Sequence, residues 1–333
     1  MPPVYHVVMA TIEYRNLGAS GLRVSTIGLG CNNFGRAGTA SESQEGTDAV
    51  IDAAIDAGVT LFDTADIYGA ERGLSETLMG NSLGARRGDI VLATKFGMDM
   101  GGANGPDWGA RGSRRYIRIA VEASLRRLQT DWIDLYQLHT PDPLTPIEET
   151  LSALDDLITE GKVRYIGHSN LAGWQIADAH YVATLAEHPK FVSAQNEYSL
   201  LVRDAEAEVL PAVNAYGLGF LPFFPLYNGL FTGKFSRDGG PSDSRIMRTK
   251  SHLLDDVPWD TIERYERFCD DRGISMLEAT FAWLLAQPGL TSVIAGATRA
   301  QQIVQNADAA GAWVPTLEEV AEISDLFDPA NLS

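Results

Sequence analysis

The chain has 333 residues, of which 45% are hydrophobic, and a formal net charge of −18. This length and apolar content suit a large globular domain with a buried core. The negative charge disfavours nucleic acid and anionic membrane surfaces as partners, and no apolar run approaches the roughly 20 residues of a membrane span. Two cysteines, Cys31 and Cys269, are too few for a disulfide framework, and no Cys/His spacing suggests a metal site. We therefore expect a cytoplasmic protein.

The start of the chain lacks the basic segment and the long apolar segment of a secretory signal peptide. We expect residues 1–10 to be an N-terminal extension and residues 11–333 to form a single domain, because no linker or charge run interrupts them. Two short segments, 12–17 and 22–25, flank Gly18-Ala19-Ser20-Gly21, which predicts a β-hairpin. In a barrel, such a hairpin would cap the N-terminal end.

From residue 26 onward, short apolar segments alternate with segments of helical periodicity. The expected strands are 26–31, 60–65, 90–95, 133–139, 163–169, 192–195, 219–226 and 291–296. The expected helices are 45–58, 114–128, 146–160, 174–187, 204–216, 259–272 and 276–286, with others beginning near 74, 300 and 317. This alternation is typical of a parallel sheet. About eight such units predict an α/β fold closed into a (β/α)8 TIM barrel rather than an open doubly wound sheet.

Four reactive side chains stand at or just beyond the ends of three consecutive predicted strands: Asp63, Tyr68, Lys95 and His139. In a parallel barrel these ends open on one face. A phenol, with a pKa of about 10, donates a proton poorly at neutral pH unless a nearby cation lowers that pKa. A buried cation in turn needs its own carboxylate. Each residue alone also fits an ordinary structural role, such as a helix cap or a core side chain. The prediction of an active site therefore depends on all four residues occurring together at strand ends.

The order and context of these four residues resemble the catalytic tetrad of the aldo-keto reductase family. The resemblance covers residues 12 to 326, and Lys234 with the long insertion after the seventh strand is similar to the bacterial and potassium-channel-subunit side of the family. It implies reduction of aldehydes or ketones to alcohols by hydride transfer. Tyr68 would be the general acid, Lys95 would lower its pKa, and Asp63 would hold Lys95. His139 would hydrogen-bond to the carbonyl oxygen.

The cofactor site has to be found without a Rossmann turn. In Gly28-Leu29-Gly30-Cys31-Asn32-Asn33-Phe34-Gly35 the third glycine is too far along for that fingerprint, so we interpret the segment as a loop that lets backbone approach a ligand. Barrel enzymes often bind phosphate at the loops after strands seven and eight. Here these loops supply Lys234 and Arg299, with Arg245 nearby, and the second loop begins a helix whose amides suit anions.

The resemblance assigns both loops to a nicotinamide dinucleotide, usually NADPH, with Arg299 placed for the 2′-phosphate. Phe224 stands where many members have Ser, and Gln305 replaces a frequent Glu. The predicted cofactor-binding residues are Gly30, Cys31, Asn32, Asp63, Ser169, Asn170, Gln195, Phe224, Pro225, Leu226, Gly229, Lys234, Arg245, Gly296, Thr298, Arg299, Gln302 and Asn306. The predicted substrate-binding residues are Phe34, Tyr68, Trp108, His139 and Tyr227. All except His139 would form apolar walls, which favours hydrophobic or aromatic carbonyls.

Two long intervals, 97–112 and 227–257, follow the third and seventh predicted strands, and we expect them to form a substrate or cofactor lid. Two other functions stay open. A Schiff-base lyase would use Lys95 as its nucleophile and need no nicotinamide. A regulatory subunit, like the channel-associated members of the family, would bind cofactor and a partner protein with little turnover. The sequence leaves the physiological substrate and the oligomeric state unassigned.

Overall fold

The computed structural model describes residues 12–242 and 244–332. Within these ranges, the side chain of Arg245 is not described. In this part of the chain, eight parallel strands form one sheet in the order β10-β3-β4-β5-β6-β7-β8-β9. The strands are β3 (Ile27–Gly30), β4 (Leu61–Asp63), β5 (Val91–Phe96), β6 (Ile133–Leu138), β7 (Val163–Ser169), β8 (Ser193–Gln195), β9 (Gly219–Phe220) and β10 (Val293–Gly296).

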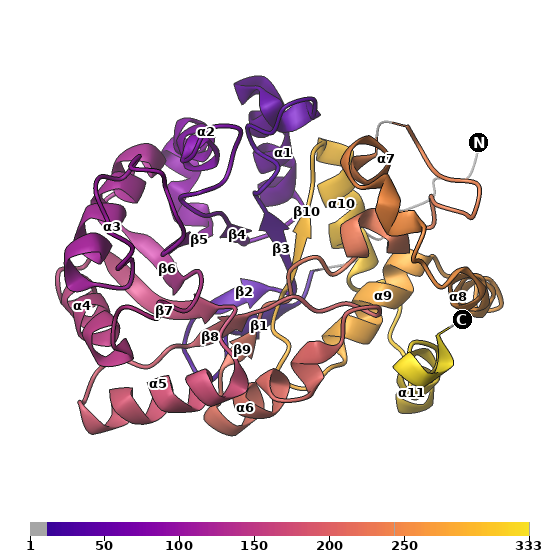
Figure 1. Cartoon of the computed structure of the whole chain (residues 1–333). Coiled ribbons are helices and arrows are strands. Elements are labelled where there is room, and N and C mark those ends of the chain that lie inside the picture. Colours follow the sequence, from indigo (N-terminus) through magenta and orange to yellow (C-terminus); the bar gives the residue numbers. More distant parts are fainter. Residues whose placement is uncertain (1–11, 243, 333) are drawn as a thin grey trace, which may run out of the picture.

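Backbone hydrogen bonds also join the two ends of this sheet. The Phe220 N–H in β9 donates to Gly289 O at 2.8 Å, and the Thr291 N–H donates to Phe220 O at 3.0 Å, just before β10. The sheet therefore curls around to meet itself, and Figure 1 shows helices surrounding it. This arrangement confirms the predicted (β/α)8 fold, in which every strand has its carboxyl end on the same face.

The helices follow the predicted order, with the addition of α7, which was not predicted. They are α1 (Gln44–Asp56), α2 (Leu74–Leu83), α3 (Arg114–Leu128), α4 (Ile147–Thr159), α5 (Gly173–Leu185), α6 (Val209–Tyr216), α7 (Arg245–Thr249), α8 (Trp259–Asp270), α9 (Met276–Leu285), α10 (Ala300–Ala309) and α11 (Leu317–Leu326). Local chemistry sets the boundaries of several of them. At the start of α9, for example, the Ser275 hydroxyl accepts from the Glu278 N–H at 3.2 Å, while the Glu278 carboxylate accepts from the Ser275 N–H at 2.6 Å.

The predicted hairpin consists of β1 (Tyr14–Asn16) and β2 (Arg23–Ser25), which pair antiparallel. Leu17 and Val24 are fully buried in a small apolar cluster with residues of the barrel interior: Leu61, Ala93, Leu135, Leu221 and Ile294. The Ser25 N–H also donates to the Thr60 hydroxyl at 2.9 Å, immediately before β4 begins. The hairpin therefore closes the N-terminal end of the barrel, as the sequence predicts.

The seventh strand is shorter than the predicted range 219–226. Regular pairing in β9 ends at Phe220. Pro222 and Pro225 lack the N–H that a ladder needs, and Phe224 has a φ of +52°, in the left-handed region. An isolated parallel bridge between Phe223 and Glu197 follows β9, and beyond Phe223 the chain continues as a loop.

The two long intervals differ in structure. Residues 97–112 contain turns without a helix or strand, whereas 227–257 contains a turn of helix η4 (Tyr227–Thr232), α7, and a second turn η5 (Ser251–Leu254). Figure 1 shows this second interval in orange beside the barrel. The predicted extension, residues 1–10, lies outside the described residues. Along 12–242 and 244–332, no helix combines the length and apolarity needed to cross a membrane.

The hairpin plug predicts a large stability effect at Leu17. Leu17→Ala should lower the free energy of unfolding by about 2–5 kcal/mol, because it removes a fully buried side chain from the barrel floor. Leu185→Ala, at a position that is 85% exposed, should change it by less than about 0.5 kcal/mol. Urea unfolding of both variants measures the two changes in the free energy of unfolding. Similar losses in the two would show that the hairpin does not stabilise the barrel.

Candidate active site

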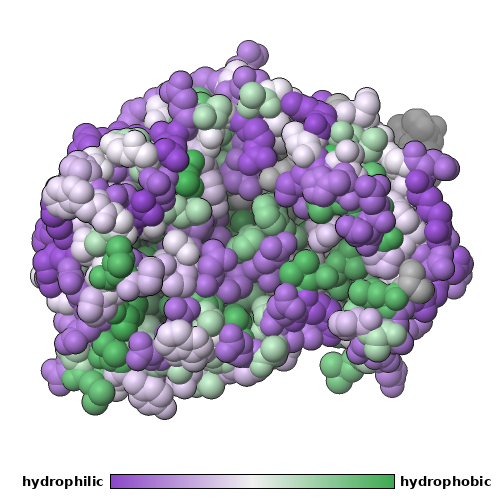
Figure 2. All heavy atoms as spheres, viewed as in Figure 1, coloured by the Kyte–Doolittle hydropathy of each residue, from purple (hydrophilic) through white to green (hydrophobic). Residues whose placement is uncertain are grey.

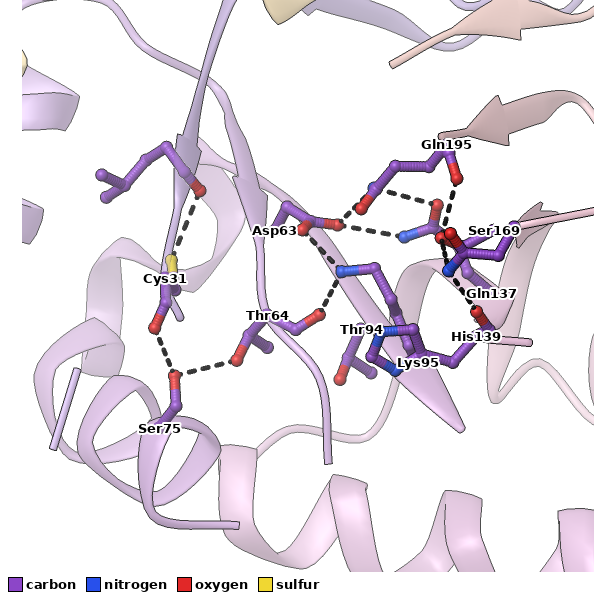
Figure 3. Close-up of polar contacts among 12 residues, drawn as sticks. Cys31, Asp63, Thr64, Ser75, Thr94, Lys95, Gln137, His139, Ser169 and Gln195 are labelled. Carbon is purple, nitrogen blue, oxygen red and sulfur yellow. Dashed lines mark hydrogen bonds and ion pairs between the residues drawn. The ribbon is translucent and has the colours of Figure 1, made fainter. Parts of the chain in front are cut away.

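The ammonium of Lys95 lies fully buried at the carboxyl ends of β4 and β5. Its Nζ donates to Asp63 Oδ2 at 2.6 Å and to Thr64 O at 2.9 Å (Figure 3). Removing an ammonium from water is expensive unless a counter-charge and hydrogen bonds replace the solvent. Burial lowers the pKa of Lys95, but Asp63 and Tyr68 together raise it by more than burial lowers it. The net pKa therefore lies above its ordinary value, and Lys95 stays charged.

The second oxygen of the Asp63 carboxylate is held from two other strands. Asp63 Oδ1 accepts from Gln137 Nε2 at 3.1 Å and from Gln195 Nε2 at 2.9 Å. Gln195, which the sequence predicts as a cofactor contact, thus also fixes the carboxylate. Gln137 is absent from the predicted site. Strand alternation could have found it, because Gln137 lies two residues before His139 and therefore on the same face of the chain.

Tyr68 lies in the loop after β4, next to Lys95. The Lys95 Nζ is 5.1 Å from the centroid of the Tyr68 ring. Burial raises the pKa of the Tyr68 phenol, whereas the charge and hydrogen bond of Lys95 lower it, and the net pKa lies above its ordinary value. The lowering effect expected of Lys95 is therefore present but smaller than the effect of burial. The phenol stays protonated at neutral pH, which is the form that a proton donor requires.

His139 follows β6 and packs edge-on against Tyr68, with 5.8 Å between the ring centroids. Burial, and then the charge of Lys95, hold the pKa of His139 well below its ordinary value, so the imidazole is neutral. Its Nδ1 is buried and has no hydrogen-bond partner within 12–242 and 244–332. The His139 backbone is fixed, since its N–H donates to Phe96 O at 2.8 Å and its carbonyl accepts from Asn170 Nδ2 at 3.0 Å.

A cavity of about 630 Å³ begins at Asp63 and Tyr68 and extends to the start of α10 and to α7. Figure 2 shows the face of the molecule in the view of Figure 1, hollowed near its middle. Among the predicted cofactor residues, those that line the cavity are Gly30, Cys31, Asn32, Asp63, Gln195, Phe224, Pro225, Leu226, Gly229, Lys234, Gly296, Thr298, Arg299, Gln302 and Asn306. Sequence reasoning missed several others, including Asn33, Arg36, Gly38, Thr39, Asn228, Arg248 and Gln305.

The lining residues fit an elongated anionic ligand such as a dinucleotide. Arg299 precedes α10, whose first amides are suited to anions, and Lys234 lies along the same wall. Gly229 has a φ of +100°, and a side chain there would be strained. The Asn228 Oδ1 is buried without a hydrogen-bond partner in the described part of the chain, so it is available to a ligand. The volume also falls within the usual range of ligand sites.

Some predicted contacts lie elsewhere in the structure. Ser169, Asn170 and His139 do not line the cavity. The Ser169 hydroxyl donates to Gln195 O at 2.7 Å, and Asn170 holds the carbonyl of His139, whose ring packs against the cavity residue Tyr68. The structure does not bring Phe34, Trp108 or Tyr227 to the cavity either. Phe34 is fully buried in the core, since an aromatic ring gains more from packing there, and Trp108 is 74% exposed. Tyr227 is half-buried against the core. The side chain of Arg245 lies outside what the structure describes.

One side chain of the strand-seven insertion, 227–257, contacts the loop after β3 on the cavity lining. The Arg248 guanidinium, in α7, donates to Gly38 O and, at 3.3 Å, to Ala37 O. These partners belong to the loop after β3, more than 200 residues earlier. This contact joins two segments that line the cavity. It is consistent with the predicted lid.

A buried polar network supports the site from outside the barrel. The Arg127 Nε, in α3, donates to Glu76 Oε2 at 2.7 Å, and the Thr94 hydroxyl donates to Glu76 Oε1 at 2.6 Å. The Arg127 Nη1 also donates to Asn104 Oδ1 at 2.9 Å, and Asn104 Nδ2 donates to Asp66 Oδ2 at 3.0 Å.

This network touches the chain on both sides of the reactive groups. Thr94 directly precedes Lys95, Asp66 lies two residues before Tyr68, and Asn104 belongs to the interval 97–112. Burial, and then the charge of Glu76, raise the pKa of Asp66 well above its ordinary value. The network therefore ties the Tyr68 loop, the Lys95 strand and the long interval into one unit.

Arg127→Met should lower the free energy of unfolding by about 3–5 kcal/mol, because it leaves the fully buried Glu76 carboxylate without its counter-charge. The control is Arg114→Met, which removes an exposed ion pair with Asp156 and should cost less than about 1 kcal/mol. Thermal and urea unfolding of both variants test the comparison. If the two variants lost equal, small amounts, the network would not support the site.

The fold and the cavity define a barrel protein with a ligand site at the carboxyl ends of its strands. A sequence profile of the Aldo/keto reductase family matches residues 26–328, so the chain belongs to the aldo/keto reductase family. This confirms the family resemblance predicted from the sequence.

Relatives cover nearly the whole chain. An uncharacterized oxidoreductase of Bacillus subtilis is 38% identical over 88% of this chain and 89% of its own length. A probable voltage-gated potassium channel subunit beta of Oryza sativa is 36% identical over 89% and 90%. The L-glyceraldehyde 3-phosphate reductase of Escherichia coli K12 is 33% identical over 94% and 91%. Together these findings support an oxidoreductase that reduces carbonyls, in a family that generally binds nicotinamide cofactors.

Proposed function

We propose that the chain is a cytoplasmic, NADPH-dependent reductase of aldehydes or ketones, with Asp63, Tyr68, Lys95 and His139 as its catalytic residues. The observation that carries the proposal is the buried Lys95 ammonium, placed between the Asp63 carboxylate and the Tyr68 ring at one end of a cavity of dinucleotide size. A charged group is kept in such a place at a free-energy cost, which a catalytic role explains.

The mechanism depends on proton delivery by Tyr68. A bound nicotinamide would supply the hydride to the carbonyl carbon. The Tyr68 phenol gives its proton to the carbonyl oxygen as negative charge develops there. Because burial keeps the phenol protonated, the donor is present across the neutral range. The Lys95 ammonium stabilises the phenolate that remains, and Asp63 keeps that ammonium in position and charged.

His139 has a complementary role at the carbonyl oxygen. A neutral imidazole has one N–H donor and one acceptor nitrogen. With its pKa held low by burial and by Lys95, His139 donates a hydrogen bond without competing with Tyr68 for the transfer of a full proton. Its edge-on contact with the Tyr68 ring supports this role, because the two side chains are neighbours.

The cofactor contacts follow from the lining of the cavity. Arg299, at the start of α10, would bind a 2′-phosphate, and Lys234 would bind the pyrophosphate; both residues line the cavity. Gln302 has a supporting role, because its Oε1 accepts from the Thr298 N–H at 2.8 Å and from the Arg299 N–H at 3.2 Å. The remaining predicted contacts in this wall, Gly296, Thr298 and Asn306, would face the adenosine half.

A Schiff-base lyase is a weaker proposal. A lysine nucleophile must lose its proton before it attacks a carbonyl. Here the pKa of Lys95 is raised overall, and its Nζ already donates to Asp63 and Thr64. The Lys95 environment therefore favours a permanent ammonium.

A cofactor-binding regulatory subunit is the second candidate, because several relatives are named as potassium channel beta subunits. Presence of all four tetrad residues favours an enzyme. Stopped-flow measurement of turnover and of NADP release separates the two functions: a regulatory subunit would release cofactor slowly and reduce aldehydes poorly.

Tyr68→Phe should lower kcat for reduction of 4-nitrobenzaldehyde by about 100-fold or more, because it removes the proton donor. NADPH binding, measured by quenching of protein fluorescence, should be retained. Tyr181→Phe, at an exposed position, is the matched control and should retain full activity. A Tyr68→Phe enzyme that turned over at the wild-type rate would remove Tyr68 from the mechanism.

Arg299→Gln should weaken NADPH binding by about tenfold or more, since a charge-assisted contact to phosphate contributes about 1.5–3 kcal/mol. NADH binding should change little, because NADH lacks the 2′-phosphate. Arg267→Gln, an exposed substitution on α8, is the control. Fluorescence titration with both nucleotides measures the affinities. Equal weakening of NADPH and NADH binding would contradict the assignment of Arg299 to the 2′-phosphate.

A further inference from the structure

A cation at the reactive end of the cavity has no role in the mechanism above. Arg36 lies in the loop after β3 and lines the same cavity as Asp63 and Tyr68. The loop that carries Arg36 is hydrogen-bonded to the loop that carries Tyr68, because the Ala70 N–H donates to Gly35 O at 2.9 Å. Arg36 therefore lies beside the place where the carbonyl group must react.

The guanidinium of Arg36 is poorly satisfied by the protein. Its Nη2 donates to Asn32 O at 3.2 Å, and none of the ion pairs formed within residues 12–242 and 244–332 includes it. A guanidinium has five N–H donors. In a chain with 44 acidic residues, a half-buried arginine without a carboxylate partner retains donors for a ligand.

The backbone around Arg36 is held in a defined turn. The Arg36 N–H donates to Asn33 O at 3.1 Å, and the Arg36 carbonyl accepts from the Thr39 hydroxyl at 2.9 Å. The neighbouring Gly35 N–H donates to Ser41 O at 2.9 Å. The guanidinium is therefore presented from a fixed loop, as a recognition group requires.

We propose that Arg36 binds an anionic group on the substrate, so that this enzyme prefers short aldehydes or ketones that carry a carboxylate or a phosphate. The inference rests on the proposed reductase function. The planar guanidinium matches the two oxygens of either anion and can bind them in a bidentate manner. Such substrates differ from the hydrophobic or aromatic carbonyls predicted from the sequence, whose proposed apolar contacts Phe34, Trp108 and Tyr227 do not line the cavity.

The position of Arg36 favours substrate over cofactor phosphate. Lys234 and Arg299 come from the loops after β9 and β10, where the cofactor phosphates are assigned. Arg36 instead comes from the loop after β3, whose Gly35 carbonyl accepts from the Ala70 N–H, two residues beyond Tyr68, the proposed proton donor. An anion held there would orient the attached carbonyl toward Tyr68.

The test compares two matched pairs of substrates with saturating NADPH: benzaldehyde with 4-carboxybenzaldehyde, and glyceraldehyde with glyceraldehyde 3-phosphate. Arg36→Met should raise KM for each anionic member by about tenfold or more, because it removes a charge-assisted contact. The neutral members should keep their kcat and KM. Arg36→Lys should restore part of the affinity, since it keeps the charge without the planar geometry. Arg267→Met is the control on an exposed arginine.

Two other outcomes decide against the inference, and a third tests the function on which it rests. Unchanged KM for the anionic members would remove Arg36 from substrate binding. Weaker NADPH binding with equal losses on neutral and anionic substrates would assign Arg36 to the cofactor. If the wild-type protein reduced no carbonyl, the proposed function would fail. Calorimetric binding of 4-carboxybenzaldehyde to the NADP complex of wild type and Arg36→Met would then decide the inference separately, and equal affinities would overturn it.

Discussion

The Lys95 ammonium, withdrawn completely from water, is the constraint on which the architecture of the site depends. An isolated buried ammonium loses several kcal/mol of solvation even after the protein relaxes. Here Asp63 supplies the counter-charge, and Gln137 and Gln195 saturate the remaining carboxylate oxygen. The four residues come from β4, β5, β6 and β8. Only a sheet that curls around can bring these strand ends to one carboxylate, so the closure of the barrel and the charge state of Lys95 depend on each other.

The same ion pair explains how a buried phenol can serve as an acid. Burial alone would hold the proton on Tyr68 too firmly, and Lys95 acts in the opposite direction. Because the ammonium is already fixed by Asp63, no reorganisation is needed when negative charge appears on the phenol oxygen. The network of Glu76, Arg127 and Asn104 then fixes the chain segments that carry Tyr68 and Lys95. Charge, geometry and stability are thus provided by one connected set of contacts.

Sequence reasoning succeeded where the signal is local. Alternating apolar segments predicted the barrel, and reactive residues at strand ends predicted which side chains would converge on one face. It failed where the outcome depends on tertiary contacts. The link from Arg248 to Gly38 joins segments more than 200 residues apart, and the burial of Phe34 depends on how the first loop turns inward. The predicted seventh strand was too long because it ran across Pro222 and Pro225, which cannot donate to a ladder, and across Phe224, whose left-handed conformation no residue pattern announced. The division of the chain into an extension and one domain stays a prediction.

The distribution of charge in the cavity explains how an acidic protein can bind an anionic ligand. At physiological ionic strength, charges more than about 8 Å apart through solvent are largely screened from one another. The overall charge of −18 therefore repels an anionic ligand only weakly once the ligand is inside the cavity, and the local cations decide whether it binds. These cations are not spread evenly. Arg299 directly precedes α10 and Lys234 follows β9, whereas Arg36 lies in the loop after β3 that is hydrogen-bonded to the Tyr68 loop. An apolar carbonyl substrate would leave the guanidinium of Arg36 facing no charge beside the reacting oxygen. A substrate with its own anion satisfies it, and the cavity then has complementary charge along its full length.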